Sequence, residues 1–125
     1  IYEGDHKIVS NCFAGKNFML SVDKAIPFGL LLNELISNST KHAFEEDQRG
    51  RIVVSLEKDG EHVKLIVSDN GKGMKPIETP KGLKSLGMKL VFSLSKQLNA
   101  ELNFINKNGL TTVVLLPNTT CNNNL

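Results

Sequence analysis

Two alternating segments in the middle of the chain constrain its fold more than any other feature. In residues 51–57 and 62–69, apolar side chains occupy every second position, and residues 58–61 between them have the composition of a tight turn. This pattern predicts an antiparallel hairpin with one buried face. Asp69 has the phase of the apolar positions in the second segment, so its carboxylate is expected on the buried face, where it needs a partner.

The remaining segments predict a sheet with helices on one face, an α+β fold with the element order β-β-α-β-β-α-β-β. Residues 1–117 should form one domain, and residues 118–125 should form a frayed polar tail. The predicted strands are 7–13, 17–22, 51–57, 62–69, 101–105 and 110–116, and the predicted helices run from Asp23, as the N-cap, to about Ala43 and from about Ser85 to Leu98.

Composition fits a single globular domain of 125 residues, with 40% hydrophobic and 22% charged residues. A net charge of +2 is too small to indicate nucleic acid or a membrane surface as the partner. Cys12 and Cys121 lack metal-ligand spacing, which favours reduced thiols. Because no apolar run is long enough to span a membrane, we expect a cytoplasmic domain whose parent protein could still be membrane-anchored.

The first predicted helix carries a polar stripe beside its apolar face. Glu34, Asn38 and Lys41 follow i, i+4, i+7 spacing and project in nearly the same direction, whereas Asn33 projects about 100° from Glu34. Such a stripe can be an exposed helix edge, worth only tenths of a kcal/mol. The alternative is one wall of a polar site, which the buried carboxylate of Asp69 favours.

Glycine-bearing segments follow the predicted hairpin. Residues 70–74, Asn-Gly-Lys-Gly-Met, allow the backbone to approach whatever Asp69 faces. Residues 75–84 are rich in Lys, Pro and Gly, which predicts a lid whose lysines either neutralise phosphate or are simply solvated. Residues 82–87 lead into the second helix, and the free amides of a helix start can cradle phosphate.

Four motifs, taken in order, resemble the nucleotide-binding domain of the gyrase, Hsp90, histidine kinase and MutL superfamily. They are Asn33-Glu34-x3-Asn38-x2-Lys41-His42, Asp69-Asn70-Gly71-Lys72-Gly73, the glycine turn into the second helix, and Gly109-Leu110-Thr111-Thr112. Residues 25–30, 41–44 and 85–88 are most similar to the catalytic domain of sensor histidine kinases with short lids. The resemblance spans residues 7–117 and implies the Bergerat fold, a two-layer α/β sandwich with a mixed, mostly antiparallel sheet.

The resemblance also implies a role for each matching residue. Glu34, Asn38 and Lys41 would be catalytic: Glu34 orients the attacking group, Asn38 holds Mg²⁺, and Lys41 meets phosphate oxygens. Asp69 would accept a hydrogen bond from the amino group of adenine. The other residues implied to bind ATP are His42, Gly71, Gly73, Gly82, Gly87, Met88 and Thr112. For His42 and Thr112, ordinary packing roles stay open.

The function implied is that of a histidine kinase catalytic domain in two-component signalling, which binds Mg-ATP and donates the γ-phosphate to a histidine on a separate dimerisation and phosphoacceptor domain. Neither His6 nor His62 has the helical surroundings of such an acceptor, so we expect the acceptor on another segment of the kinase. A response regulator would be the indirect partner. The alternative is a nucleotide-dependent protein-binding switch or an anti-sigma-factor-like serine kinase.

Overall fold

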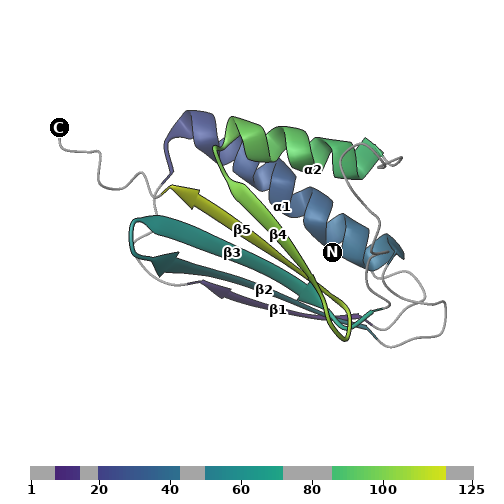
Figure 1. Cartoon of the computed structure of the whole chain (residues 1–125). Helices are drawn as coiled ribbons and strands as arrows, with labels where there is room; N and C mark the ends of the chain where they lie inside the picture. The colour runs from purple at the N-terminus through teal and green to yellow at the C-terminus, as the bar shows by residue number, and fades with distance from the viewer. Residues whose placement is uncertain (1–7, 15–19, 43–49, 72–85, 118–125) are drawn as a thin grey trace.

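The computed structural model describes residues 8–14, 20–42, 50–71 and 86–117. Two helices lie side by side on one face of a five-stranded sheet (Figure 1). The predicted α+β sandwich is therefore confirmed. The elements are β1 (Ile8–Ala14), α1 (Val22–His42), β2 (Gly50–Asp59), β3 (His62–Asp69), α2 (Leu86–Gln97), β4 (Glu101–Asn106) and β5 (Leu110–Pro117). Neither α1 nor α2, the helices of the described residues, is long and apolar enough to cross a membrane.

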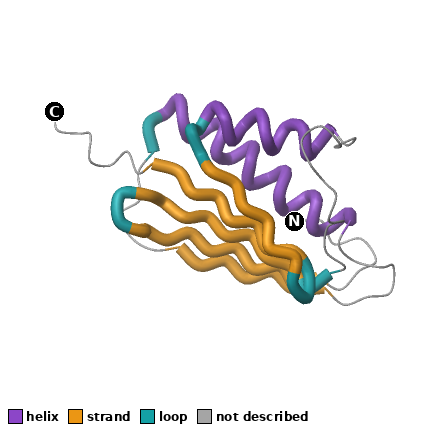
Figure 2. Tube along the Cα trace, viewed as in Figure 1, coloured by secondary structure: helices purple, strands orange, loops and turns teal. Residues whose placement is uncertain are grey.

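The sheet has the order β1-β2-β3-β5-β4 (Figure 1). Figure 2 shows its strands as one layer beneath the helices. β1 runs parallel to β2, and every other pair is antiparallel, as the predicted mixed sheet requires. The β2–β3 hairpin turns at Gly60, whose φ of 64° lies in the left-handed region that glycine adopts without steric cost. Asp69, the last residue of β3, pairs with Ile52.

The core fills the space between the two helices and the sheet. Leu31 and Leu35 of α1 and Val91 and Leu94 of α2 are buried against the inner face of the strands, because the helical spacing of three to four residues keeps them on one side. At the outer edge, the ring of Phe92 on α2 contacts that of Phe104 on β4 edge-on, with centroids 6.1 Å apart. This packing holds α1 and α2 against the sheet and against each other.

The predicted strand at residues 17–22 is wrong where the structure describes it. Leu20 and Ser21 are not in a strand, Val22 is the first residue of α1, and residues 17–19 lie outside the described residues. The backbone carbonyl of Ser21 accepts hydrogen bonds from the amides of Lys24 and Ala25, both at 2.9 Å. Ser21 therefore caps the helix two residues before the predicted N-cap, and the capping overrides the short alternating pattern.

The predicted N-cap, Asp23, instead lies in the first turn of α1. A hydrogen bond from the side chain of Ser21, followed by one from its own backbone amide, lowers the pKa of the Asp23 carboxyl below its ordinary value. A carboxylate at this end of a helix also complements the positive end of the helix dipole.

Candidate functional site

The carboxylate of Asp69 is buried at the end of β3, as its phase in the strand predicted. The residue is 7% exposed, and the strand alternates buried and partly exposed positions along its length. Oδ1 accepts hydrogen bonds from the backbone amides of Gly71, at 2.9 Å, and Leu110, at 3.2 Å. Oδ2 accepts one from the hydroxyl of Ser39, at 2.9 Å. These three donors supply the partners that a buried carboxylate needs.

A glycine brings the β4–β5 turn onto Asp69. Gly109 has a φ of 118°, and a Cβ built on it would overlap the backbone carbonyl oxygen of Asp69 and lie 2.9 Å from the Cα of Asn70. Only glycine allows this approach, which carries the amide of the next residue, Leu110, to the Asp69 carboxylate.

A second polar group lies between the two helices. A Cβ built on Gly87, in the first turn of α2, would lie 3.0 Å from Oε1 of Glu34 and 3.3 Å from Oδ1 of Asn38. The amide nitrogen of Asn38 donates to the sulfur of Met88 at 3.2 Å, which leaves its oxygen on the side of Gly87. Glu34 and Asn38 are half-buried and Asn33 is exposed, so the stripe is not a plain exposed edge.

The group around Asp69 and the group between the helices are neighbours, because both include residues of α1. Ser39, the donor to Asp69, directly follows Asn38 in the helix. Thr112 is 3% exposed on the same face of the sheet and pairs with Val67, two residues before Asp69. The structure thus gathers seven of the predicted residues in one region: Glu34, Asn38, Asp69, Gly71, Gly87, Met88 and Thr112.

The other predicted residues are placed only in part. Lys41 and His42 form the last turn of α1, but their side chains lie outside what the structure describes. Gly73 and Gly82 lie in residues 72–85, also outside the described residues.

Ser39 is a residue of the site that the sequence motifs did not indicate. Its signal was its position, because it continues the row of Leu31 and Leu35 at four-residue spacing and so points toward the core. A serine in a buried row needs a polar partner, and the only buried carboxylate among the described residues, that of Asp69, supplies it.

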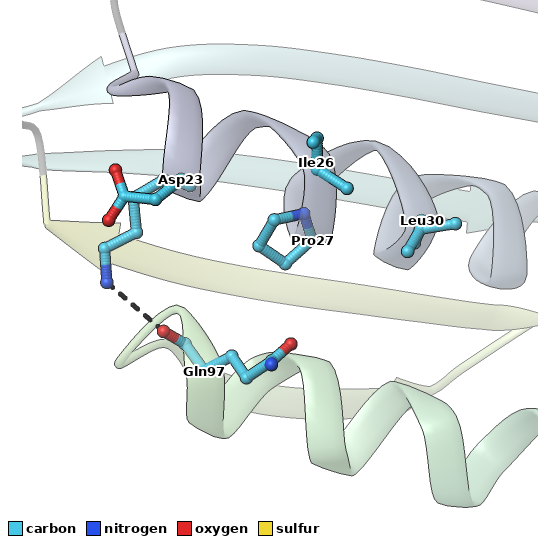
Figure 3. A pocket seen from close by; sticks show the side chains of 6 residues that line it. Asp23, Ile26, Pro27, Leu30 and Gln97 are labelled. Carbon is cyan, nitrogen blue, oxygen red and sulfur yellow. Dashed lines mark hydrogen bonds between the residues drawn. The ribbon is translucent and has the colours of Figure 1, made fainter.

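A cavity of about 490 Å³ lies at the other end of the helices (Figure 3). It is lined by Gln97 of α2 and by five residues of α1: Asp23, Lys24, Ile26, Pro27 and Leu30. The backbone carbonyl oxygen of Gln97 accepts a hydrogen bond from Nζ of Lys24 at 3.2 Å. Fifteen residues, about 22 Å of helix, separate Asp23 from Asn38. This cavity is therefore separate from the polar site.

One oxygen of the polar site, that of Asn38, is a possible ligand for a cation. In the described ranges, no three or more His, Cys, Asp or Glu side chains come together to hold a metal ion. Mg²⁺, however, is commonly bound through one or two protein oxygens with the rest of its shell from phosphates and water. The oxygen of Asn38 fits this arrangement, because it lies beside the amino end of α2. The first amides of a helix favour anions such as the phosphates that would complete the shell of the cation.

Two known proteins are similar to this chain in sequence. Blue-light-activated histidine kinase 2 of Erythrobacter litoralis is 32% identical over 94 residues, which cover 74% of this chain and 27% of that protein. Sensor protein LytS of Streptococcus mutans is 36% identical over 101 residues, covering 70% of this chain and 17% of its own. The chain thus spans about a quarter or less of the length of these two relatives.

A solved histidine kinase structure has a similar fold. The histidine kinase domain of the blue-light activated histidine kinase EL346 from Erythrobacter litoralis superposes with a TM-score of 0.80 at 27% identity, covering 94% of this chain and 54% of that one. The family described as histidine kinase-, DNA gyrase B- and HSP90-like ATPase matches residues 23–120. This chain belongs to that ATPase family, and its sandwich is the ATP-binding fold of histidine kinases.

Proposed function

We propose that the chain is the ATP-binding catalytic domain of a sensor histidine kinase, formed by residues 1–117 with residues 118–125 as a polar tail. It binds Mg-ATP and donates the γ-phosphate to a histidine on a separate dimerisation and phosphoacceptor domain of the same kinase, which serves a response regulator in the cytoplasm. The two curated relatives, named as a histidine kinase and a sensor protein, support this assignment. The observation that carries it is the buried Asp69 carboxylate beside the polar group of Glu34, Asn38 and Gly87.

Asp69 is proposed to recognise adenine. An ionised carboxylate offers about four acceptor positions, and among the described residues two donors occupy Oδ1 and one occupies Oδ2. The position left on Oδ2 can accept from the exocyclic amino group of adenine. Guanine carries a carbonyl oxygen at the equivalent place and cannot donate there. Thr112, on the same face of the sheet, would add a hydroxyl at the base of this pocket.

The group between α1 and α2 is proposed to hold the phosphates. Asn38 supplies a neutral oxygen ligand for Mg²⁺, which neutralises phosphate charge during the transfer. Glu34, one turn earlier, orients the attacking imidazole of the acceptor. Gly87 lets the side-chain oxygens of Glu34 and Asn38 lie against the first turn of α2, because a Cβ there would lie 3.0 and 3.3 Å from them. The phosphates are proposed to bind at the adjoining first amides of α2.

The remaining predicted residues complete the nucleotide site in this proposal. Lys41 meets phosphate oxygens as a point charge, and His42 lines the phosphate side. Gly71 and Gly73 let the backbone approach the base, Gly82 flanks the triphosphate, and Met88 fixes the amide of Asn38.

Calorimetric titration of ATP into the wild-type chain and into Asp69→Asn, with Mg²⁺ present, tests the base assignment. The variant places an amide donor against the adenine amino group, so ATP affinity should fall by at least about tenfold, since a hydrogen bond to a charged group contributes about 1.5–3 kcal/mol. GTP serves as the control: guanine cannot donate to the Asp69 carboxylate, so the substitution should not lower the affinity for GTP. Equal ATP affinity in the two proteins would refute the assignment.

A further inference from the structure

We propose that Ser39 is a positioning residue for base recognition: its hydroxyl holds the Asp69 carboxylate in the orientation that accepts the exocyclic amino group. The inference rests on the proposed binding of ATP through Asp69. It adds a residue that neither the helical stripe nor the glycine motifs of the sequence indicated.

The direction of the Ser39 hydroxyl sets it apart from the other buried hydroxyls on the two helices. A serine or threonine inside a helix commonly donates to a carbonyl of its own preceding turn. Thr40 donates in this way to the carbonyl of Ser37, and Ser95 donates to that of Val91. Ser39 instead crosses from α1 to the sheet and donates to Oδ2 of Asp69, thirty residues away in sequence, at 2.9 Å.

The three donors together fix the rotation of the carboxylate. The last side-chain torsion of an aspartate has broad wells, so burial alone does not set the plane of the carboxylate. The amides of Gly71 and Leu110 both bind Oδ1, and Ser39 is the donor that binds Oδ2 among the described residues. Because an ionised carboxylate only accepts, Ser39 has to donate, and the second acceptor position of Oδ2 stays open and fixed in direction.

The same hydrogen bond connects the two halves of the proposed nucleotide site. Ser39 follows Asn38, the proposed ligand of Mg²⁺, in the helix that bears the phosphate-binding residues. Asp69 ends the strand that bears the base-binding carboxylate. Ser39 is 6% exposed and Asp69 is 7% exposed, so water does not readily replace the missing donor when the hydroxyl is removed.

The test compares ATP with purine riboside triphosphate, which lacks the exocyclic amino group, by titrating both into wild type and Ser39→Ala in the presence of Mg²⁺. ATP affinity is expected to fall about tenfold in Ser39→Ala, which corresponds to about 1.4 kcal/mol. The affinity for purine riboside triphosphate should stay within about twofold, because this nucleotide has no exocyclic amino group to donate a hydrogen bond to the Asp69 carboxylate. A merely structural role of Ser39 would weaken both nucleotides alike.

Ser95→Ala is the matched control, since it also removes a buried helical hydroxyl, one that donates within its own helix. It should change the melting temperature without changing the ratio of the two affinities. If Ser39→Ala does not fold, Ser39→Cys replaces it, because a thiol is only a weak donor and the same selective loss is expected.

An equal loss for both nucleotides, or unchanged ATP affinity, in a folded Ser39 variant would overturn the inference. If the wild-type chain bound neither nucleotide, the proposed function itself would be wrong, and the inference would fall with it. The two failures are therefore distinguishable.

Discussion

Gly87→Ala separates nucleotide binding from stability, because the structure predicts opposite signs for the two. The added methyl would lie 3.0 Å from Oε1 of Glu34 and 3.3 Å from Oδ1 of Asn38, so these side chains have to move by only a few tenths of an ångström. Alanine favours a helix over glycine by up to about 1 kcal/mol in the interior and less in the first turn. The variant should therefore melt at the same temperature as wild type or up to about 4 °C higher.

Binding of ATP should weaken in the same variant. The methyl would displace the oxygens of Glu34 and Asn38 from the amino end of α2, where they are proposed to serve Mg²⁺ and the phosphates. Loss of one contact between the phosphate and a helix amide corresponds to about 1.5–3 kcal/mol, so the dissociation constant for Mg-ATP should rise at least about tenfold. Calorimetric titration and a thermal melt of the same sample measure both quantities.

Gly29→Ala is the control for this experiment. Gly29 lies in α1, and a Cβ added there would have nothing within 4 Å, so its replacement should raise the melting temperature and leave ATP affinity unchanged. Unchanged ATP affinity in Gly87→Ala would refute the assignment of the phosphate site to this end of α2. A melting temperature below that of wild type would refute it as well, because the loss of affinity would then follow from a less stable fold.

Two further predictions concern the opposite ends of α1. Asn38→Ala should abolish phosphotransfer from radiolabelled ATP to a histidine on an added phosphoacceptor domain. The melting temperature should shift little, because Asn38 is half-buried and its amide contacts Met88. Phosphotransfer that survives would show that Asn38 is not the Mg²⁺ ligand. The lowered pKa of Asp23 means that its ionised form stabilises the fold above its ordinary pKa and that this contribution is lost as the pH falls through the lowered value. The melting temperature of Asp23→Asn should therefore lie below that of wild type at neutral pH and converge with it in acid, and a pH-independent difference would contradict the role of the Ser21 hydrogen bond.

The membership of an ATPase family agrees with what the local motifs implied. The parts of the fold that were predicted correctly follow from short-range geometry. The hairpin and the burial of Asp69 follow from a two-residue period, and the proximity of Glu34 to Asn38 follows from the rise of one helical turn. The strand predicted up to Val22 failed for the opposite reason, because a cap at Ser21 depends on the backbone conformation there and not on the alternation of side chains.

What the sequence by itself determined is therefore the direction in which each side chain points from its own helix or strand. The tertiary structure decided which of these side chains meet. The hydroxyl of Ser39 on α1 donates to Asp69 on β3, and Gly87 lies close to Asn38 only because α2 packs beside α1. Gly109 likewise brings the β4–β5 turn onto the end of β3. Periodicity is fixed by local sterics, whereas these contacts arise from the packing of apolar faces that lie thirty or more residues apart, so a single sequence carries only the residue types that permit them.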